Sequence, residues 1–558
     1  MLNFIIGRNN SGKTEKIRAL IAERASENKK CILIVPEQFS FESERSILEK
    51  IGAQKMLNVD ILSFTRLAFV INEQYGKALN KTIDDGTRKV LMSLSLEALS
   101  GKLEYFKRFS SKPALLSNLL TFVTELKQCA VTPDEIAEIS GKTGNKSLGK
   151  KLSELSLIAA SYDALVSRSF FDDENLLTIA ADMISETDFF DGKAVYFDAF
   201  CGFTKQERNC IKSILPKAEN VFISLCTDRD LSREGVSVFE NVNSEFSHLK
   251  ECAAEQNVGV SSPEILNVKE DGRSPELVYL EKYLCGEESE PYKEECDNIV
   301  VCAAGNRADE ADFVACEIKK LLRCNPTLRC RNIAVIERTA GTYDKELSES
   351  FKKYGVPMFE DKRRPIGIQP VMVFVKCLLA LCAEGFSTES FMRLLKTGLT
   401  ALSGDEISEL ENYAFLWNID GSKWRRDFTE NPDGLGFDVT EKSQEKLIRL
   451  NDIRKRSVLP VLAFKKDFEE ADGEKKSRLI YEFLIKNGVT ERLREKIEYL
   501  VSSGDTVLCE EQDTVWATLM DMLGKMASAI GETVITAKRY SELFNILLSA
   551  VTLGSLPQ

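Results

Sequence analysis

Gly7 to Thr14 read GRNNSGKT and match the pattern G-x-x-x-x-G-K-[ST] in full. Glycines at both ends of such a pattern let the main chain curl, so that consecutive N–H groups point at an anion. The lysine then contacts the β- and γ-phosphates of a nucleotide, and the last hydroxyl ligates Mg²⁺. The sequence therefore predicts that ATP with Mg²⁺ binds at the residues of this loop: Gly7, Arg8, Asn9, Asn10, Ser11, Gly12, Lys13 and Thr14.

The residues on either side of the loop have the patterns that a phosphate site requires. Residues 2–6 (LNFII) are a short apolar run suited to a buried strand. From Thr14 onward, apolar residues recur at helical spacing. This spacing places a helix N-terminus, with its positive dipole end, beneath the phosphates.

A nucleotide-hydrolysing enzyme also needs an acid near the Mg²⁺ and a base that activates water. Asp198 follows the apolar run AVYF and is the candidate Mg²⁺-shell acid, although a helix-capping or turn Asp is the alternative interpretation. The next residue is Ala199, where helicases with a D-E-x-x motif have Glu. Glu207 is the nearby acid, but it stands too far along the following helix. We therefore expect slow or no hydrolysis.

The composition is typical of an ordinary globular protein and narrows the function classes. A single histidine, His248 in a polar stretch, excludes H-E-x-x-H metal sites and is expected on the surface. Fifteen scattered cysteines without a C-x-x-C pair indicate reduced core residues. Neither a signal peptide nor an apolar run of membrane-spanning length is evident, so a cytoplasmic protein without membrane contact is expected. The net charge of −13 argues against a wholly basic nucleic-acid-binding surface.

Strand and helix signals alternate in two parts of the chain, which predicts an α/β class with helical insertions. Strand signals at residues 32–35, 59–64, 194–197 and 220–225 belong to the first part. The acidic segment Lys269–Asn298 has the composition of a linker, and Ile299–Ala304 and Asn332–Arg338 are predicted strands of a second unit. The expected divisions are a first domain (1–75 and 184–285), a helical insertion (76–183), the first part of a second domain (286–390) and a further helical insertion domain (391–558).

Several motifs follow one another in a specific order: GRNNSGKT, LIVPEQFSFESE, ILSFTRLAF, VYFDAFCGFTKQE, the block from Asn332 to Ile366, RLLKTGL and LENYAFLWNIDGSKW. Their order and spacing resemble the B subunit of the bacterial AddAB helicase–nuclease family, with a Firmicutes-like source. The resemblance runs through essentially the whole chain.

The resemblance implies two RecA-like P-loop domains of the superfamily 1 helicase type, with large helical insertions. It implies an ATP-dependent complex that resects double-strand breaks for recombinational repair. In this family the B subunit is thought to have lost motor activity, while a partner A subunit unwinds DNA. By the same resemblance, Asp198 takes the magnesium-shell position, and Arg338 corresponds to the arginine that reaches the γ-phosphate across the domain cleft. An exposed strand-end residue is the alternative for Arg338.

The family also uses its degenerate motor to recognise a short Chi-type hotspot in exiting single-stranded DNA. The positions of this sequence that lie on DNA-facing motifs of the family are Gln38, Ser40, Phe64, Arg66, Phe69 and Phe203. Aromatic rings stack on bases, and Arg and amide side chains read base edges. Burial in the core is the alternative for the phenylalanines. Trp424, between Lys423 and Arg425, has a similar stacking character.

Family members are roughly twice this length, and their C-terminal half carries a nuclease with bound Mg²⁺ and a four-cysteine iron–sulfur cluster. This chain ends at TLGSLPQ, so both are expected only in a C-terminal half that is missing here. Two other functions remain open at this point. One is an active superfamily 1 translocase, with its base supplied from elsewhere. The other is a scaffold that a nucleotide merely stabilises.

Overall fold

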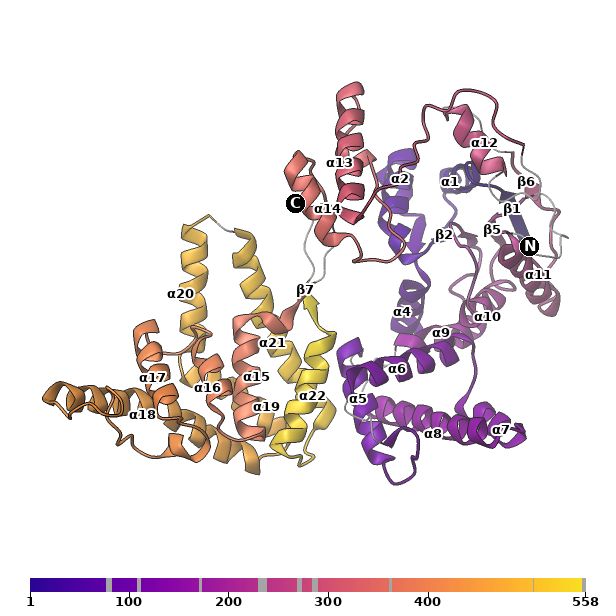
Figure 1. Cartoon of the computed structure of the whole chain (residues 1–558). Helices are drawn as coiled ribbons and strands as arrows, with labels where there is room; N and C mark the ends of the chain where they lie inside the picture. Colours follow the sequence, from indigo (N-terminus) through magenta and orange to yellow (C-terminus); the bar gives the residue numbers. More distant parts are fainter. Residues whose placement is uncertain are drawn as a thin grey trace.

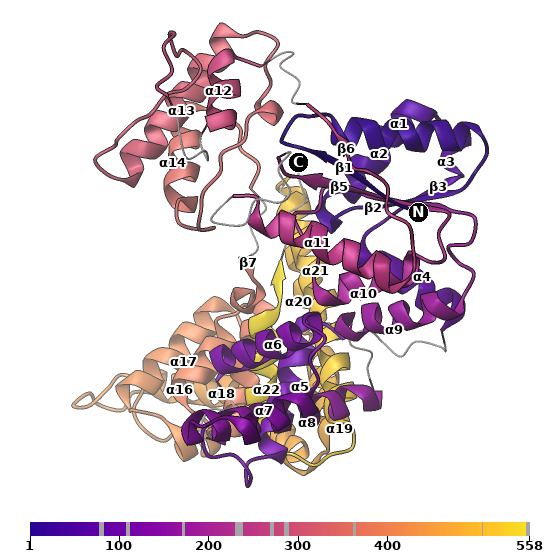
Figure 2. The same ribbon diagram turned by 90° about the vertical axis from the view of Figure 1, so that its right-hand side faces the viewer.

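The computed structural model describes residues 1–76, 83–107, 112–169, 173–228, 238–267, 273–283, 290–360, 364–504 and 506–553. Figures 1 and 2 show three parts. A sheet with helices on both faces contains the N-terminus, a large helical body lies below it, and the helix pair α13 and α14 stands apart from both.

The sheet is six-stranded and wholly parallel, with the order β3-β2-β4-β5-β1-β6. Strands covered on both faces are expected to be apolar almost throughout, as the predicted strand segments are. The structure confirms the α/β class in this unit. Its strands are β1 (Leu2–Gly7), β2 (Cys31–Ile34), β3 (Val59–Leu62), β4 (Ala194–Phe197), β5 (Asn220–Cys226) and β6 (Glu264–Ile265).

Successive residues of β1 face opposite sides of the sheet and anchor two helix layers. Phe4 and Ile6 join one buried cluster, whereas Ile5 joins the other. The Ile5 side is covered by α1 (Lys13–Ser26), α2 (Ser40–Ile51) and α3 (Ala53–Met56), and the short η1 (Glu37–Phe39) directly precedes α2. The opposite side is covered by α4 (Phe64–Tyr75), α9 (Asp173–Glu186), α10 (Lys205–Ile214) and α11 (Glu240–Glu255).

The helical body joins two segments that are far apart in the sequence. Residues from 83–166 and from 366–548 share one buried cluster, and α5 packs against α22 (Figure 1). The first segment contributes α5 (Asp85–Ala98), α6 (Pro113–Gln128), α7 (Pro133–Lys142) and α8 (Lys146–Ser169). The second contributes α15 (Pro370–Ala383), α16 (Thr388–Leu395), α17 (Gly404–Leu416), α18 (Glu441–Glu470), α19 (Gly473–Lys486), α20 (Val489–Ser502), α21 (Thr506–Ile530) and α22 (Ala537–Ala550), with η4 (Ile366–Ile368) and η5 (Gly421–Arg425).

Two expected boundaries differ from the structure. The insertion was expected over residues 76–183, but α9 packs on the sheet unit through Leu176, Ala180 and Ile184. The expected linker contains a helix, α12 (Pro275–Tyr283). Its sequence PELVYLEKY has few helix breakers, and the Pro stands at the first position, where a helix tolerates it.

The second predicted α/β unit consists, in the described residues, of α13 (Arg307–Cys324), α14 (Asp344–Tyr354) and the short η3 (Cys330–Asn332). The prediction of strands at Ile299–Ala304 and Asn332–Arg338 is wrong for this structure, because these segments are not paired with another strand. A strand needs a neighbour for its backbone groups, and the described chain places none beside them. After α14 the chain enters β7 (Arg364–Pro365), which pairs antiparallel with β8 (Thr552–Leu553).

Candidate nucleotide-binding site

The predicted phosphate loop leaves the carboxyl end of β1 and leads directly into α1. Gly12 is the N-cap of α1 and has no side chain that could cap the first amides. The first intrahelical bond runs from the Lys16 amide to the Gly12 carbonyl, at 2.9 Å. The preceding amides have no acceptor within the helix, and the positive end of the helix dipole lies there. Such a helix end is an anion-binding site.

The geometry of the loop explains why the motif has glycine at both positions, Gly7 and Gly12. A Cβ at Gly7 would lie 2.3 Å from Ser11 Oγ and 2.9 Å from the Leu266 carbonyl oxygen, too close for any side chain. Gly12 has a φ of +87°, in the left-handed region that favours glycine. The loop therefore curls in a way that other residues at these two positions would prevent.

Lys13 lies inside the curl of the loop. Its ammonium group donates to the carbonyl oxygens of Gly7 and Arg8, each at 2.8 Å, and to Ser11 Oγ at 3.4 Å. Phosphate oxygens are charged acceptors and bind an ammonium more strongly than neutral carbonyls do. The donors of the loop are thus of the kind that the phosphates of a nucleotide require, and nucleotide binding stays a prediction.

Asp198 follows β4 at the carboxyl edge of the sheet, the edge from which the phosphate loop also leaves. Its amide donates to the Ile34 carbonyl at 3.1 Å, and its carboxylate Oδ1 accepts a hydrogen bond of 2.5 Å from Ser224 Oγ of β5. The side chain is only 5% exposed. Mg²⁺ prefers oxygen ligands, and both the Asp198 carboxylate and the Thr14 hydroxyl are of this kind. The metal site stays a prediction.

The expectation of slow or no hydrolysis rests on two residues after Asp198, Ala199 and Glu207. Ala199 has a φ of +66°, a left-handed conformation that alanine rarely adopts, and its side chain carries no acid. Glu207 is engaged in a capping box at the start of α10, where its Oε2 accepts the Thr204 amide at 2.7 Å. This contact caps the first turn of α10, and the prediction that Glu207 does not activate water stays a prediction.

Arg338 lies in the α13–α14 part of the chain and is exposed. The described residues show no hydrogen bond or ion pair between Arg338 and the phosphate loop. The structure does not bring the two together, so its role at a γ-phosphate stays a prediction.

The predicted DNA-facing residues divide into exposed and covered ones. Gln38, Arg66 and Phe69 are exposed, Phe69 by 42%, and Ser40 is partly covered. Phe64 and Phe203 are 6% and 7% exposed, and both rings pack against Phe200. Contact of these two rings with DNA would require the aromatic cluster to open, because their faces are covered by protein.

The sequence interpretation missed Phe41. It is 78% exposed on α2, directly after the predicted Ser40. The signal was present in the stretch FESERSIL (residues 41–48), where Phe41 and Leu48 stand two helical turns apart. Such spacing usually marks a buried face, but here Phe41 and Leu48 are exposed.

Trp424 was expected to have stacking character, and this prediction is wrong. Its side chain is fully buried, its ring centroid lies 5.0 Å from that of Phe391, and its Nε1 donates to Thr388 Oγ1 at 2.8 Å. The turn η5 directs the indole inward and leaves the neighbouring cations, Lys423 and Arg425, on the surface.

The other expectations from composition can be compared with the described residues. His248 is exposed on α11, as predicted. The cysteines of the described chain are free, but only Cys31, Cys210, Cys377 and Cys382 among them are buried, so the expectation of core residues is wrong for the others. No group of three or more possible metal ligands is found in the described residues. Within the same residues, no helix has both the length and the apolar composition to cross a membrane.

Comparison with known proteins decides the family. Residues 4–281 match the family model described as "ADDB, N-terminal". The chain belongs to the AddB family. The AddB match contains the phosphate loop, Asp198 and Ala199, and it ends within α12.

Curated relatives carry the same assignment. Proteins of Acetivibrio thermocellus, Clostridium acetobutylicum and a Thermoanaerobacter species are 29%, 28% and 29% identical to this chain, and each is named as the B subunit of an "ATP-dependent helicase/deoxyribonuclease". The matches cover 100% of this chain but 49% of each relative. The chain thus spans about half the length of these AddB relatives and corresponds to their N-terminal half.

Proposed function

We propose that this chain is the nucleotide- and single-strand-binding part of an ATP-dependent helicase–deoxyribonuclease subunit that processes double-strand breaks for recombinational repair. The names of the relatives support the complex and its second subunit. The observation that carries the proposal is that the phosphate loop and a buried Asp198 leave the same edge of the parallel sheet, and that Ala199 follows Asp198. Gly7 to Thr14 would hold the phosphates of ATP, and Thr14 and Asp198 would hold Mg²⁺.

In this proposal the chain binds ATP but does not act as a motor. A bound Mg²⁺ supplies charge neutralisation, but water activation also needs a base. Ala199 carries no carboxylate, and Glu207 is occupied by its cap. A cytoplasmic AddA-type helicase–nuclease subunit then unwinds the DNA in a heterodimer, and this chain contacts the exiting single strand.

We place the single-strand contact on the surface formed by η1 and the starts of α2 and α4. Gln38 and Arg66 offer an amide and a guanidinium for base edges and phosphates. Phe69 and Phe41 offer exposed rings on which bases can stack. The predicted Ser40 is partly covered and Phe64 and Phe203 are buried, so these three side chains offer less area to a bound strand.

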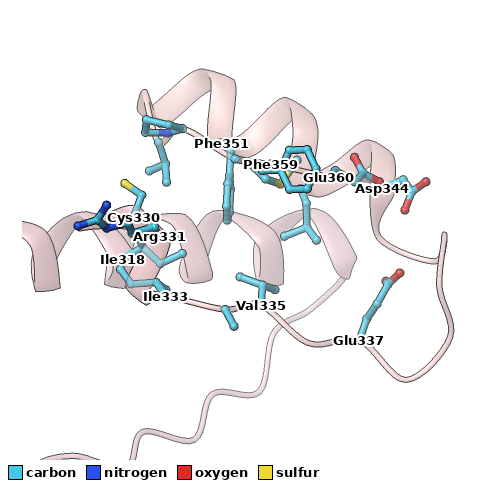
Figure 3. Close-up of a pocket in the computed structure, with 15 residues that line it drawn as sticks. Ile318, Cys330, Arg331, Ile333, Val335, Glu337, Asp344, Phe351, Phe359 and Glu360 are labelled. Carbon is cyan, nitrogen blue, oxygen red and sulfur yellow. The ribbon is translucent and has the colours of Figure 1, made fainter. Parts of the chain in front are cut away.

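The α13–α14 part is, in this proposal, an incomplete second RecA-like domain. Val301 and Ile336, in the two segments predicted as strands, are 92% and 91% exposed. Figure 3 shows Ile318, Phe351 and Phe359 around a cavity of about 730 Å³ between the helices and residues 333–337. Apolar residues in strand-like segments rarely remain in water.

The polypeptide that follows the matched region in the longer relatives is the proposed partner of these segments. β7 carries the chain away from α14, and β8 runs antiparallel to it. The C-terminal end of β8 therefore lies beside the N-terminal end of β7, the end that follows the α13–α14 part in the chain, as the yellow strand beside β7 in Figure 1 shows. The nuclease and an iron–sulfur cluster are likewise assigned to that further half of the relatives.

Two measurements on the purified chain test the proposed function. Isothermal titration with Mg-ATP is expected to show binding that Lys13→Ala abolishes, with Lys16→Ala as the matched control. Steady-state ATP hydrolysis with single-stranded DNA is expected to stay near background. Turnover of several per second that disappears in Lys13→Ala would instead establish an active translocase. ATP binding without salt-dependent DNA binding would establish a nucleotide-stabilised scaffold.

A further inference from the structure

Arg8 connects the phosphate loop to a helix outside it. The Arg8 side chain donates from Nε to Glu281 Oε1 at 3.1 Å and from Nη2 to the Glu281 carbonyl oxygen at 2.6 Å. Glu281 lies in the last turn of α12, where carbonyl oxygens lack an intrahelical donor. The guanidinium thus caps this helix end and pairs with its carboxylate, so two contacts fix its orientation.

The main chain of Arg8 also takes part in the closed conformation of the loop. Its carbonyl oxygen accepts from Lys13 Nζ at 2.8 Å and from the Ser11 amide at 3.3 Å. The residue that holds α12 therefore also holds the lysine that nucleotide phosphates require. A movement of Arg8 therefore affects both its contact with Lys13 and its contact with Glu281.

The other end of α12 is tied to the start of the α13–α14 part. Glu276, which is buried, accepts hydrogen bonds on Oε1 from the Asn298 amide at 3.0 Å and from the Asn298 side chain at 2.6 Å. Asn298 directly precedes the segment predicted as the first strand of the second unit. Helix α12 is thus held at both ends, by the phosphate loop and by the beginning of the second unit.

We propose that Arg8 and Glu281 form a nucleotide-sensitive clasp that couples the phosphate loop to the α13–α14 part through α12. This inference rests on the proposed nucleotide binding. A triphosphate carries several negative charges and competes with one carboxylate for the Arg8 guanidinium. Nucleotide binding favours the state in which Arg8 no longer contacts Glu281. In that state α12 has lost its contact with the phosphate loop, and the hydrogen bonds between Glu276 and Asn298 weaken as well.

The clasp predicts that Glu281 opposes nucleotide binding. Glu281→Gln keeps the shape of the side chain and the carbonyl contact but removes the competing charge. The dissociation constant of Mg-ATP is expected to fall about three- to tenfold, which is the size of a partly buried ion pair. Glu290→Gln is the matched control, because Glu290 forms an exposed pair with Lys293 in the same stretch and should leave the constant unchanged.

Hydrogen exchange of the full chain supplies the second measurement. In the wild type, ATP is expected to increase amide exchange in residues 275–283 and at Asn298. In Glu281→Gln, exchange in these residues should already be raised without ATP. Arg8→Gln should also raise exchange in these residues, since it removes the guanidinium that contacts Glu281.

The outcomes separate the clasp from the function on which it rests. If the wild type binds ATP but Glu281→Gln binds equally well and α12 exchange ignores ATP, the clasp is overturned while nucleotide binding stands. If neither protein binds ATP, the proposed function fails and the clasp fails with it. Tighter binding by Glu281→Gln, together with ATP-dependent exchange in α12, supports both.

Discussion

Ser224 Oγ donates a hydrogen bond of 2.5 Å to Asp198 Oδ1, across the neighbouring strands β5 and β4. Ser224 also stands opposite Ile5 of β1, two residues before the phosphate loop begins. Ser224 lies on β5, the strand between β4 and β1. From there its hydroxyl orients the carboxylate of Asp198, the predicted Mg²⁺ ligand. Partners of a metal ligand that hold its orientation usually matter for metal affinity.

Ser224→Ala is expected to weaken Mg-ATP binding about tenfold, because Asp198 loses the donor that orients it. Binding of ATP in the presence of a chelator should change little, since the loop itself is untouched. Titration calorimetry with and without Mg²⁺ measures the difference. Ser247→Ala, on the surface of α11, is the control. Equal losses with and without Mg²⁺ would show that Ser224 acts on the fold and not on the metal site.

Ala199→Gly is expected to stabilise the sheet unit. The φ of +66° places the alanine Cβ in a left-handed conformation, which costs about 1–2 kcal/mol. Glycine relieves this cost but loses more chain entropy on folding, so a net gain of about 0.5–1 kcal/mol in the free energy of unfolding remains. Urea denaturation followed by circular dichroism measures it. Ala181→Gly, in the middle of α9, should lower stability by contrast.

The sequence predicted those parts of the site that local signals determine. β1, the phosphate loop and Asp198 after AVYF are each encoded within a few neighbouring residues. The strand prediction at residues 332–338 failed because a strand also needs a partner, which no local pattern supplies. The helix α12 was missed because acidic residues and flanking Pro and Gly have the composition of a linker. This helix contacts the site through hydrogen bonds between two residues far apart in the sequence, Arg8 and Glu281.

Trp424 illustrates the same limit within the helical body. Its cationic neighbours indicated a surface, but the indole packs against Phe391 of α16 and against Phe428. Trp424→Ala is expected to lower the free energy of unfolding by about 3–5 kcal/mol, since it leaves a large cavity. Trp424→Phe should cost less. Denaturation measures both, and single-strand affinity at low temperature should match the wild type. Reduced DNA affinity in a fully folded Trp424→Phe would restore the stacking interpretation.

Arg66→Ala tests the single-strand surface on α4. An exposed arginine that contacts a phosphate contributes about one unit to the slope of log affinity against log salt. The variant is therefore expected to weaken binding to single-stranded DNA and to reduce this slope by about 0.7–1. Fluorescence anisotropy at several salt concentrations measures the slope. Arg478→Ala, which removes an exposed cation on α19, is the control. Identical slopes for both variants and the wild type would remove α4 from the DNA surface.

Asp84 caps α5 and reaches Lys525 of α21 at 2.7 Å, so it ties together two segments 441 residues apart. Burial acts to raise the pKa of the Asp84 carboxyl, but the Lys525 ammonium and the Thr87 amide and hydroxyl outweigh it and hold this pKa below the usual value of 3.8. A carboxyl with a lowered folded-state pKa stabilises the fold above its unfolded pKa. That contribution disappears as the pH falls through the folded pKa.

Asp84→Asn keeps a good helix cap and removes the charge, so it isolates the ion pair. At pH 7 the variant is expected to lose about 0.5–1 kcal/mol, a modest value because both side chains are partly exposed to solvent. Below pH 3.8 the difference from the wild type should shrink progressively toward zero. Thermal denaturation between pH 3 and pH 7 follows it. The neighbouring Asp85→Asn, in an exposed position of the same helix, is the control. A difference that persists unchanged at low pH would mean that the cap, and not the charge, joins the two halves of the helical body.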